Sequence, residues 1–197
     1  MSEHAPPDTA PLSTPARERE STSAEPTARR AGLGRLRRSA GFFLIAGAVL
    51  ALDQATKAII RATLSPGEAW PDGDWLLHIV HVTNSGAAFG ILQGQTVFLI
   101  VTSILGVAAI VLYYVSPPLE HGLLRTALAL QLGGAAGNMI DRIRVGEVTD
   151  FINFEFFPAF NVADASITVG VVAIIGFLLA LETGRLRDPS EAGKAGD

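Results

Sequence analysis

The stretch GGAAGNMIDRIRVGEVTDFINFEFFPAFNVAD, residues 133–164, decides how this chain folds. It leaves one long apolar segment, passes through a polar region, and enters another apolar segment at Asp164. Asp150 lies in the polar region between the two segments. Ionisable groups are costly inside lipid, so their concentration where two apolar segments end indicates a site at a membrane surface.

The composition of the whole chain also predicts a membrane protein. Its 197 residues are 49% hydrophobic and only 17% charged, whereas about 25% charged residues is usual for soluble domains. The apolar residues form blocks close to the roughly 20 residues that cross a bilayer. We predict an all-α membrane protein with four transmembrane helices, at about residues 40–60, 96–115, 123–140 and 164–182.

Both ends of the chain are expected to lie outside the membrane domain. Residues 1–36 hold five of the eleven prolines and few large apolar residues, which predicts a disordered N-terminal extension. A basic cluster precedes the first span and favours a cytoplasmic N-terminus over a nucleic-acid-binding arm. The cluster consists of Arg29, Arg30, Arg35, Arg37 and Arg38. With residues 37–184 forming the four-span domain, residues 185–197 become a cytoplasmic tail and residues 141–164 become external.

A second external segment, residues 62–95, separates the first two spans. Proline and glycine residues mark turns in it, and the β-branched run at residues 76–82 predicts a strand. His78 and His81 lie in that run, and we interpret them as ordinary exposed histidines because no second ligand cluster accompanies them. The chain has no cysteine, which excludes disulfides and thiolate zinc sites. Metal binding is therefore not predicted for this segment.

Two spans carry polar residues at helical spacing. Asp53 and Lys57 are four residues apart and share one helix face, so they form either a salt bridge that braces a site or a functional pair. We favour the bracing role. Asn138, Asp141 and Arg142 share one face at the external end of the third span. Glycines at 133 and 137 in the same span suit close helix packing.

Carboxylates are the remaining candidates for chemistry. The sequence has no G-x-S-x-G elbow, no H-E-x-x-H motif and no P-loop. Two aspartates held close together share one proton, so one acts as a base toward water and the other as an acid. Asp150 and Asp164 suit this best, because Asp164 opens a helix and Asp150 has apolar neighbours. Alone, Asp164 reads as a helix cap, Asp150 as a turn residue and Asp141 as an ion-pair partner.

Five motifs in order resemble the bacterial lipoprotein signal peptidase family, also called signal peptidase II. The motifs are LDQATK at 52–57, NSGAAFG at 84–90, GGAAGNMIDR at 133–142, VTDF at 148–151 and FNVAD at 160–164. The resemblance covers about residues 40–182. Thr149 stands where the family is expected to have an apolar residue, and Ala165 precedes Ser166 after the last motif, where Ser often comes first.

The resemblance implies an aspartic endopeptidase of the bacterial inner membrane. Such enzymes cut prolipoproteins before the diacylglyceryl-modified lipobox cysteine. Asp150 and Asp164 would then be the catalytic pair, and Asp53, Lys57 and Asp141 would support the fold. The positioning residues would be Asn84, Asn138, Arg142 and Asn161. The family implies no metal or organic cofactor, a small external β-cradle, and a short surface helix after Asp150. The expected partners are the lipid-modified substrate and membrane lipid, with no nucleic acid, and the chain is expected to act as a monomer.

Three other interpretations remain at this point. A small proton-coupled transporter or channel would place Asp53 and Lys57 on a pathway, but the second span has no charge and the acids cluster at one surface. A non-enzymatic assembly factor would use the aspartates as caps and ion pairs. An intramembrane protease of the presenilin type would need a Gly-x-Gly-Asp signature and more spans, and both are missing.

Overall fold

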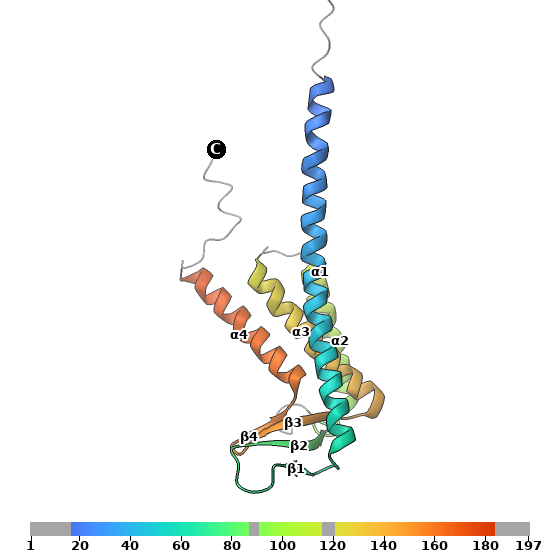
Figure 1. Ribbon diagram of the computed structural model, residues 1–197, viewed down its shortest axis with the longest axis vertical. Coiled ribbons are helices and arrows are strands. Elements are labelled where there is room, and N and C mark those ends of the chain that lie inside the picture. Colours follow the sequence, from blue (N-terminus) through green and yellow to red (C-terminus); the bar gives the residue numbers. More distant parts are fainter. Residues whose placement is uncertain (1–16, 87–90, 116–120, 184–197) are drawn as a thin grey trace, which may run out of the picture. The chain divides into compact units, whose positions relative to one another are not determined.

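The computed structural model describes residues 17–86, 91–115 and 121–183 (Figure 1). Its elements are α1 (Arg17–Thr63), β1 (Ala69–Trp70), β2 (Leu77–Asn84), α2 (Thr96–Val115), α3 (Gly122–Val145), β3 (Val148–Phe154), β4 (Phe157–Phe160) and α4 (Val162–Glu182). The chain divides after Ala40 into two compact units. The unit that begins at Gly41 holds all the strands and every candidate site residue.

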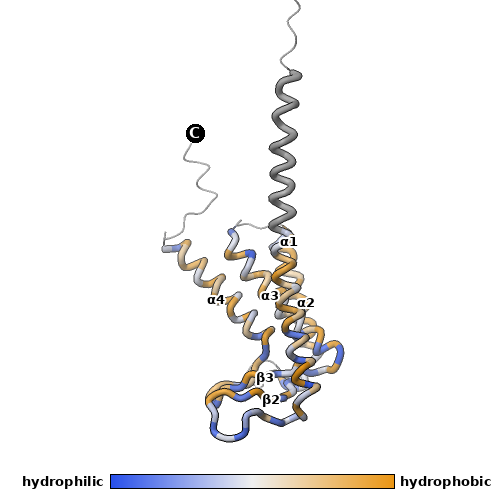
Figure 2. The backbone as a smooth tube through the Cα atoms, viewed as in Figure 1, coloured by the Kyte–Doolittle hydropathy of each residue, from blue (hydrophilic) through white to orange (hydrophobic). Residues whose placement is uncertain are grey.

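Three helices among the described residues are long and apolar enough to cross a membrane. They are Ser39–Thr63 within α1, Thr96–Val115 and Val162–Glu182. Figure 2 shows apolar residues along most of α2 and α4. Leucine and valine side chains of α2 are largely exposed, among them Val97 and Leu112, as expected for a helix that faces lipid. The chain is therefore a membrane protein, and the part that the structure describes holds three membrane-capable helices.

The predicted third span is present as a helix but differs in polarity from the other three. α3 contains Arg125, Asp141, Arg142 and Arg144, and it is absent from the helices that meet the length and hydropathy requirements for crossing a membrane. The presence of a helix over residues 123–140 is confirmed, since α3 spans Gly122–Val145. Its crossing of the membrane stays a prediction.

The four strands form one antiparallel sheet in the order β1-β2-β3-β4. β2 begins at Leu77, which confirms the strand predicted at 76–82. In Figure 1 the sheet lies next to the start of α4, because β4 ends at Phe160 and α4 begins at Val162. This arrangement brings β3, β4 and the first turn of α4 together.

The prediction of a short surface helix after Asp150 is wrong. Residues 148–160 instead form the β3–β4 hairpin, with Leu77 opposite Phe154 and Phe154 opposite Phe157. The segment is rich in phenylalanine and β-branched residues, which favour strands because they pack well on a pleated surface. The helical interpretation came from the resemblance, and the local composition opposes it.

The structure also differs from the disorder expected for residues 1–36. Residues 17–36 belong to α1, which continues without a break to Thr63. Extending an existing helix requires no new nucleation, so arginine, glutamate and alanine residues can prolong it at low cost. Residues 1–16 and 184–197 lie outside the described residues, so the expectations for the extreme N-terminus and for the tail are not addressed.

Small residues let α3 approach its neighbours closely. A Cβ atom added at Gly133 would lie 2.5 Å from the carbonyl oxygen of Ala46, and one at Gly134 would lie 2.5 Å from that of Ala163. One at Gly137 would collide with the carboxylate of Asp53. The packing role predicted for Gly133 and Gly137 is therefore confirmed, and it places α1 and α4 against α3 near the polar residues.

Candidate active site

Asp150 lies on β3, opposite Val82 of β2, beside an irregularity in the β2–β3 register. Both of its carboxylate oxygens accept hydrogen bonds from amides. Asn84 Nδ2 donates to Oδ2 at 2.9 Å, and Asn161 Nδ2 donates to Oδ1 at 2.6 Å. The residue is only 2% exposed. Asp150 is thus a buried strand residue and not the turn residue that its local sequence suggests.

Asp164 occupies the third position of α4 and takes part in a capping box. Asn161 is the N-cap, and its Oδ1 accepts a hydrogen bond from the Asp164 backbone N at 3.0 Å. In return, Asp164 Oδ2 accepts from the Asn161 backbone N at 3.3 Å. Asn138 Nδ2 donates to the other oxygen of Asp164, Oδ1, at 2.7 Å. The anion therefore lies at a helix N-terminus with two N–H donors.

Asn161 connects the two aspartates. Its side-chain amide donates to Asp150, and its backbone N donates to Asp164. It is fully buried. One residue therefore holds both carboxylates, which brings together two groups that are distant in the sequence.

A second polar cluster is centred on Lys57 and is linked to Asp164 through Asn138. The Lys57 Nζ atom lies 2.9 Å from Asp53 Oδ2 and 2.8 Å from Asp141 Oδ2. It also donates to Asn138 Oδ1 at 2.8 Å. Asp53 and Lys57 are fully buried, and Asp141 is 2% exposed. Asp53 Oδ1 accepts a hydrogen bond from Ala163 N at 3.0 Å, which links this cluster to the first turn of α4.

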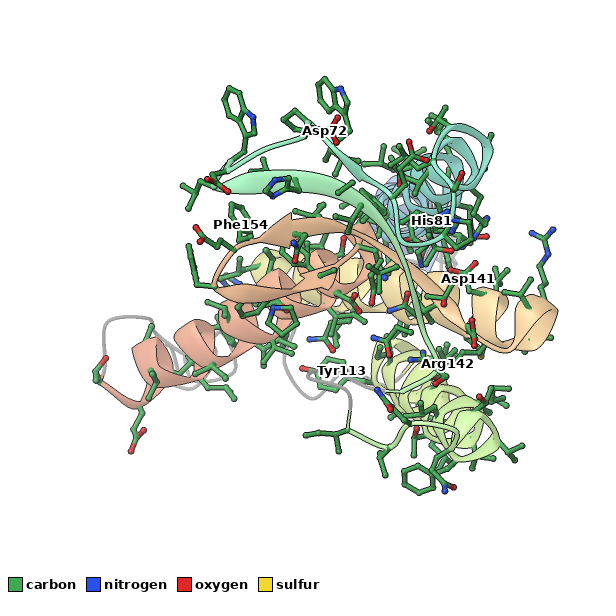
Figure 3. All side chains as sticks on the ribbon, turned by 90° about the horizontal axis from the view of Figure 1, so that it is seen from below. Asp72, His81, Tyr113, Asp141, Arg142 and Phe154 are labelled. Atoms are coloured by element: carbon green, nitrogen blue, oxygen red, sulfur yellow. The ribbon has the colours of Figure 1, made fainter. Side chains whose placement is uncertain are left out.

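Arg142 points away from this cluster, toward the segment after β2. Figure 3 shows Asp141 and Arg142 at neighbouring positions on α3. Arg142 Nη2 donates to the carbonyl oxygen of Gly86 at 2.9 Å, and Asn84 Oδ1 accepts from Gly86 N at 2.9 Å. Residues 87–90, the rest of the predicted NSGAAFG motif, lie outside the described residues. Arg142 and Asn84 therefore hold the start of that motif.

Burial raises the pKa of Asp150 from 3.8 to about 6. This value is the net result of several causes, of which burial is the largest: the negative charge of Asp164 also raises the pKa, whereas the hydrogen bonds from Asn84 and Asn161 and the charge of Lys57 lower it. A carboxyl group with this pKa exchanges its proton near neutral pH. Asp150 can therefore hold the shared proton of a carboxylate pair.

Three residues of the network have no role assigned from the sequence. Gln54 Nε2 donates to Asp53 Oδ2 at 3.1 Å and to the carbonyl oxygen of Gly137 at 3.2 Å. Arg61 donates to Thr149 Oγ1 at 3.0 Å and lies 3.6 Å from Asp141. Helical spacing offered a signal for Arg61, which lies four residues after Lys57. Thr149 offered none, because its partner is distant in the sequence.

One of the two histidines of β2, His81, differs from expectation in its burial. His81 is 6% exposed, and its Nδ1 lies 2.8 Å from the Leu64 carbonyl oxygen. The interpretation of His81 as an exposed residue is therefore wrong, because the turn before β2 covers it. Within the described ranges, no group of three or more histidine, aspartate or glutamate residues could hold a metal ion.

Known proteins resemble this chain over most of its length. A lipoprotein signal peptidase of Moorella thermoacetica is 44% identical over 147 residues, covering 73% of this chain and 97% of that protein. One of Caldanaerobacter subterraneus subsp. tengcongensis is 46% identical over 143 residues, covering 72% and 97%. A solved bacterial membrane enzyme matches with a TM-score of 0.70 and 36% identity, covering 75% of this chain and 93% of the other. A second gives 0.64 and 38%, covering 71% and 92%.

Membrane-capable helices and two carboxylates held by asparagine amides, Asp150 buried and Asp164 half-buried, are features expected of a membrane peptidase of the aspartic class. The model of one such family, signal peptidase (SPase) II, matches residues 45–180. With that match and the relatives above, the chain belongs to the signal peptidase II family.

Proposed function

We propose that Asp150 and Asp164 are the catalytic pair with which this membrane peptidase removes signal peptides from prolipoproteins. Cleavage occurs before the diacylglyceryl-modified cysteine of the lipobox. The observation that carries this proposal is the double contact of Asn161, which donates to Asp150 Oδ1 at 2.6 Å and to Asp164 Oδ2 at 3.3 Å. A structural cap for α4 would need only the second of these contacts.

The surroundings of the two carboxylates suit different roles. Asp164 accepts hydrogen bonds from Asn138 Nδ2 and Asn161 N at the start of a helix, and these donors stabilise its anion. Asp150, with a pKa near 6, holds the shared proton. Asp164 then acts as the base that activates water, and Asp150 donates to the scissile carbonyl oxygen as charge develops there. As the C–N bond breaks, Asp164 gives the proton taken from water to the leaving amine, and Asp150 takes back its proton from the diol oxygen, which restores the shared proton of the pair.

The amide and arginine side chains are assigned to positioning. Asn84, Asn138 and Asn161 donate to the carboxylates and fix their rotamers. Arg142 holds the start of the NSGAAFG motif, and its Nε has no hydrogen-bond acceptor among the described residues. Asp53, Lys57 and Asp141 support the site from behind, and catalysis needs no metal or organic cofactor.

The site is placed at the external surface of the inner membrane. Strand alternation puts Asp150, Ile152 and Phe154 on one face of β3, and cross-strand pairing extends this face with apolar residues. The added residues are Leu77 and Ile79 of β2, Trp70 of β1 and Phe160 of β4. Trp70 is 65% exposed and Leu77 is 44% exposed. An apolar face of this kind suits contact with lipid beside the site, with tryptophan at the membrane–water interface.

The topology follows from the basic residues and from α3. If α3 also crosses the membrane, the chain has four spans and both of its ends lie on the cytoplasmic side, where the basic cluster at residues 29–38 is favoured. Substrate, lipid-modified and embedded in the same leaflet, then reaches Asp150 and Asp164 from the bilayer. One chain supplies every residue assigned a role, so the proposed enzyme is complete as a monomer.

The test is cleavage of a diacylglyceryl-modified prolipoprotein peptide by purified protein. Wild-type enzyme is expected to cut it and to leave the same peptide without lipid uncut. Asp150→Asn and Asp164→Asn should each lose activity by about 10³-fold or more, while the yield of folded protein is retained. Substantial cleavage by either variant would exclude the pair. Cleavage of the unmodified peptide at the same rate would exclude the lipid requirement.

A further inference from the structure

Lys57 is a fully buried ammonium group that touches neither proposed catalytic carboxylate directly in the contacts described above. Its three close partners are Asp53 Oδ2, Asp141 Oδ2 and Asn138 Oδ1. An ammonium group has three donors and no acceptor. The contacts with Asp53 and Asp141 are ion pairs, and Asp141 Oδ2 has no hydrogen-bond donor among the described residues. The contact with Asn138 is a hydrogen bond, and Asn138 in turn contacts Asp164.

The Asn138 amide has two chemically different ends, and each faces a matching partner. Its Oδ1 accepts from Lys57 Nζ at 2.8 Å and from Asn161 Nδ2 at 3.2 Å, and its Nδ2 donates to Asp164 Oδ1 at 2.7 Å. Turning the amide by 180° would set its NH₂ group against two donors and its oxygen against the carboxylate. That orientation loses three hydrogen bonds. Two of the three are charge-assisted, which is the strongest kind: the one that Lys57 donates and the one that the Asp164 carboxylate accepts.

We propose that Lys57 is a positioning residue for cleavage: its ammonium fixes the Asn138 amide so that the NH₂ group faces Asp164 and holds that carboxylate in the orientation that receives the water. This inference rests on the proposed function of Asp164. It gives Lys57 a role in the reaction in addition to its support of the fold.

The charges around Lys57 explain why a lysine is suited to this place. Asp53 and Asp141 flank the ammonium and stabilise its charge in the interior, where an unpaired charge would be very costly. Asp53 also accepts from Ala163 N, so the same carboxylate ties the ammonium to the turn that carries Asp164. An apolar residue at position 57 would keep the packing but leave the Asn138 oxygen without its ionic donor.

The experiment compares two double variants, Asp53→Asn/Lys57→Met and Asp53→Asn/Lys57→Gln. In the wild type, two carboxylates and one ammonium give this cluster a formal charge of −1. Both double variants keep that charge through Asp141 alone. Glutamine retains an N–H donor directed toward Asn138, whereas methionine has none. Asp53→Asn alone sets the baseline.

The expected result is a change in kcat and not in KM. The methionine variant should lose about 10²-fold in kcat per folded molecule, because misplacing a reacting group costs rates of that order. The glutamine variant should recover about tenfold of this loss, and KM should stay within about twofold since Lys57 is fully buried. Equal kcat values for the two variants, or wild-type kcat with only a lower folded yield, would overturn the proposal.

A second pair of variants keeps Lys57 in place and covers the case in which the double variants do not fold. In Asn138→Asp, the Lys57 ammonium binds one oxygen of the new carboxylate, and the other oxygen then faces the Asp164 carboxylate, which repels it. In Asn138→Ala, nothing opposes Asp164. The aspartate variant should therefore melt at a temperature at least as high as the alanine variant yet have a lower kcat. An aspartate variant as active as the alanine variant, or more active, would contradict an orienting role for Lys57.

The same assay separates this inference from the proposed function. Asp150→Asn and Asp164→Asn are measured in parallel with the same lipid-modified peptide. If both lose cleavage while the Lys57 variants keep wild-type kcat, only the positioning role fails. If either of these two aspartate variants cleaves normally, the proposed catalytic pair fails first.

Discussion

Replacing Asp150 with asparagine should make the protein inactive and, above neutral pH, more stable. Burial raises the pKa of Asp150 from 3.8 to about 6. A difference of about two in pKa corresponds to roughly 3 kcal/mol of folding free energy. Because the pKa of Asp150 is higher in the folded state than in the unfolded state, ionisation of Asp150 destabilises the folded protein. This destabilisation is fully present above about pH 6, shrinks as pH falls toward 3.8, and vanishes below that value.

The asparagine side chain also introduces a cost that does not depend on pH. Asn84 and Asn161 both donate to Asp150, so the new NH₂ group must face one of these donors. The mismatch costs about 1–2 kcal/mol. At pH 8 the variant avoids the roughly 3 kcal/mol that the ionised, buried Asp150 costs the wild type. After the mismatch is subtracted, the variant should be more stable than wild type by about 1–2 kcal/mol. At pH 4.5, where only about 1 kcal/mol of the ionisation cost remains, the advantage should disappear.

The assay is thermal unfolding in detergent at pH 4.5 and pH 8. The difference between variant and wild type should grow by about 2 kcal/mol between the two pH values, which is roughly 4–8 °C in Tm for a chain of this size. Glu155→Gln, a change at an exposed acid of the β3–β4 turn, is the matched control and should show no such growth. The two aspartates titrate as a pair, so the measured growth reports their shared proton. A pH-independent difference would refute the assignment of that proton to a buried Asp150.

Three further changes test other parts of the structure. Asn161→Ala removes the cap of α4, so it should lower the free energy of unfolding by about 1 kcal/mol and should also lower kcat. Asn161→Ser should keep the cap and the Tm but lower kcat, because serine supplies no amide to Asp150. If the two variants lost the same amount of Tm, the capping role would be wrong. Gly137→Ala pushes a methyl group into the carboxylate of Asp53 and should lower the Tm by several degrees, as overpacking costs about 1–3 kcal/mol. Gly176→Ala, with open space at its Cβ, is the matched control and should leave the Tm unchanged or higher. Raising the pH of the cleavage assay from 6 to 9 should reduce kcat/KM as the pair loses its proton, since the pKa of Asp150 is about 6; a flat profile over this range would count against Asp150 as the acid.

Hydrophobic periodicity and block length predicted most of the helices from the sequence. The uncharged block at 96–115 is α2, and the block at 164–182 is α4 apart from its first turn. Such blocks can be recognised from the sequence alone, because their burial in lipid depends only on their own residues. α3 is a different case, because its polar face is satisfied by partners on α1 and α4 that sequence spacing does not identify.

The parts that could not be predicted depend on contacts between distant segments. The β3–β4 hairpin needs β2 as its neighbour, and the family resemblance led to a helix there instead. The burial of His81 depends on the Leu64 carbonyl oxygen across a turn. The sequence suggested Asp150 and Asp164 as a carboxylate pair, but it contained no sign that Asn161 would bond to both. That contact exists only once the hairpin has returned the chain to the start of α4.

The capping role of Asn161 has a consequence for how the enzyme is made. The chain leaves the ribosome from its N-terminus, so Asp53 and Lys57 reach the bilayer early, and Asp164 arrives with the final helix. The residue that starts this helix is also the one that joins the two carboxylates. A nascent chain therefore has no assembled pair until α4 has formed its first turn. The proposed catalytic pair is therefore completed late in synthesis, after the helices that carry Lys57 and Asn138.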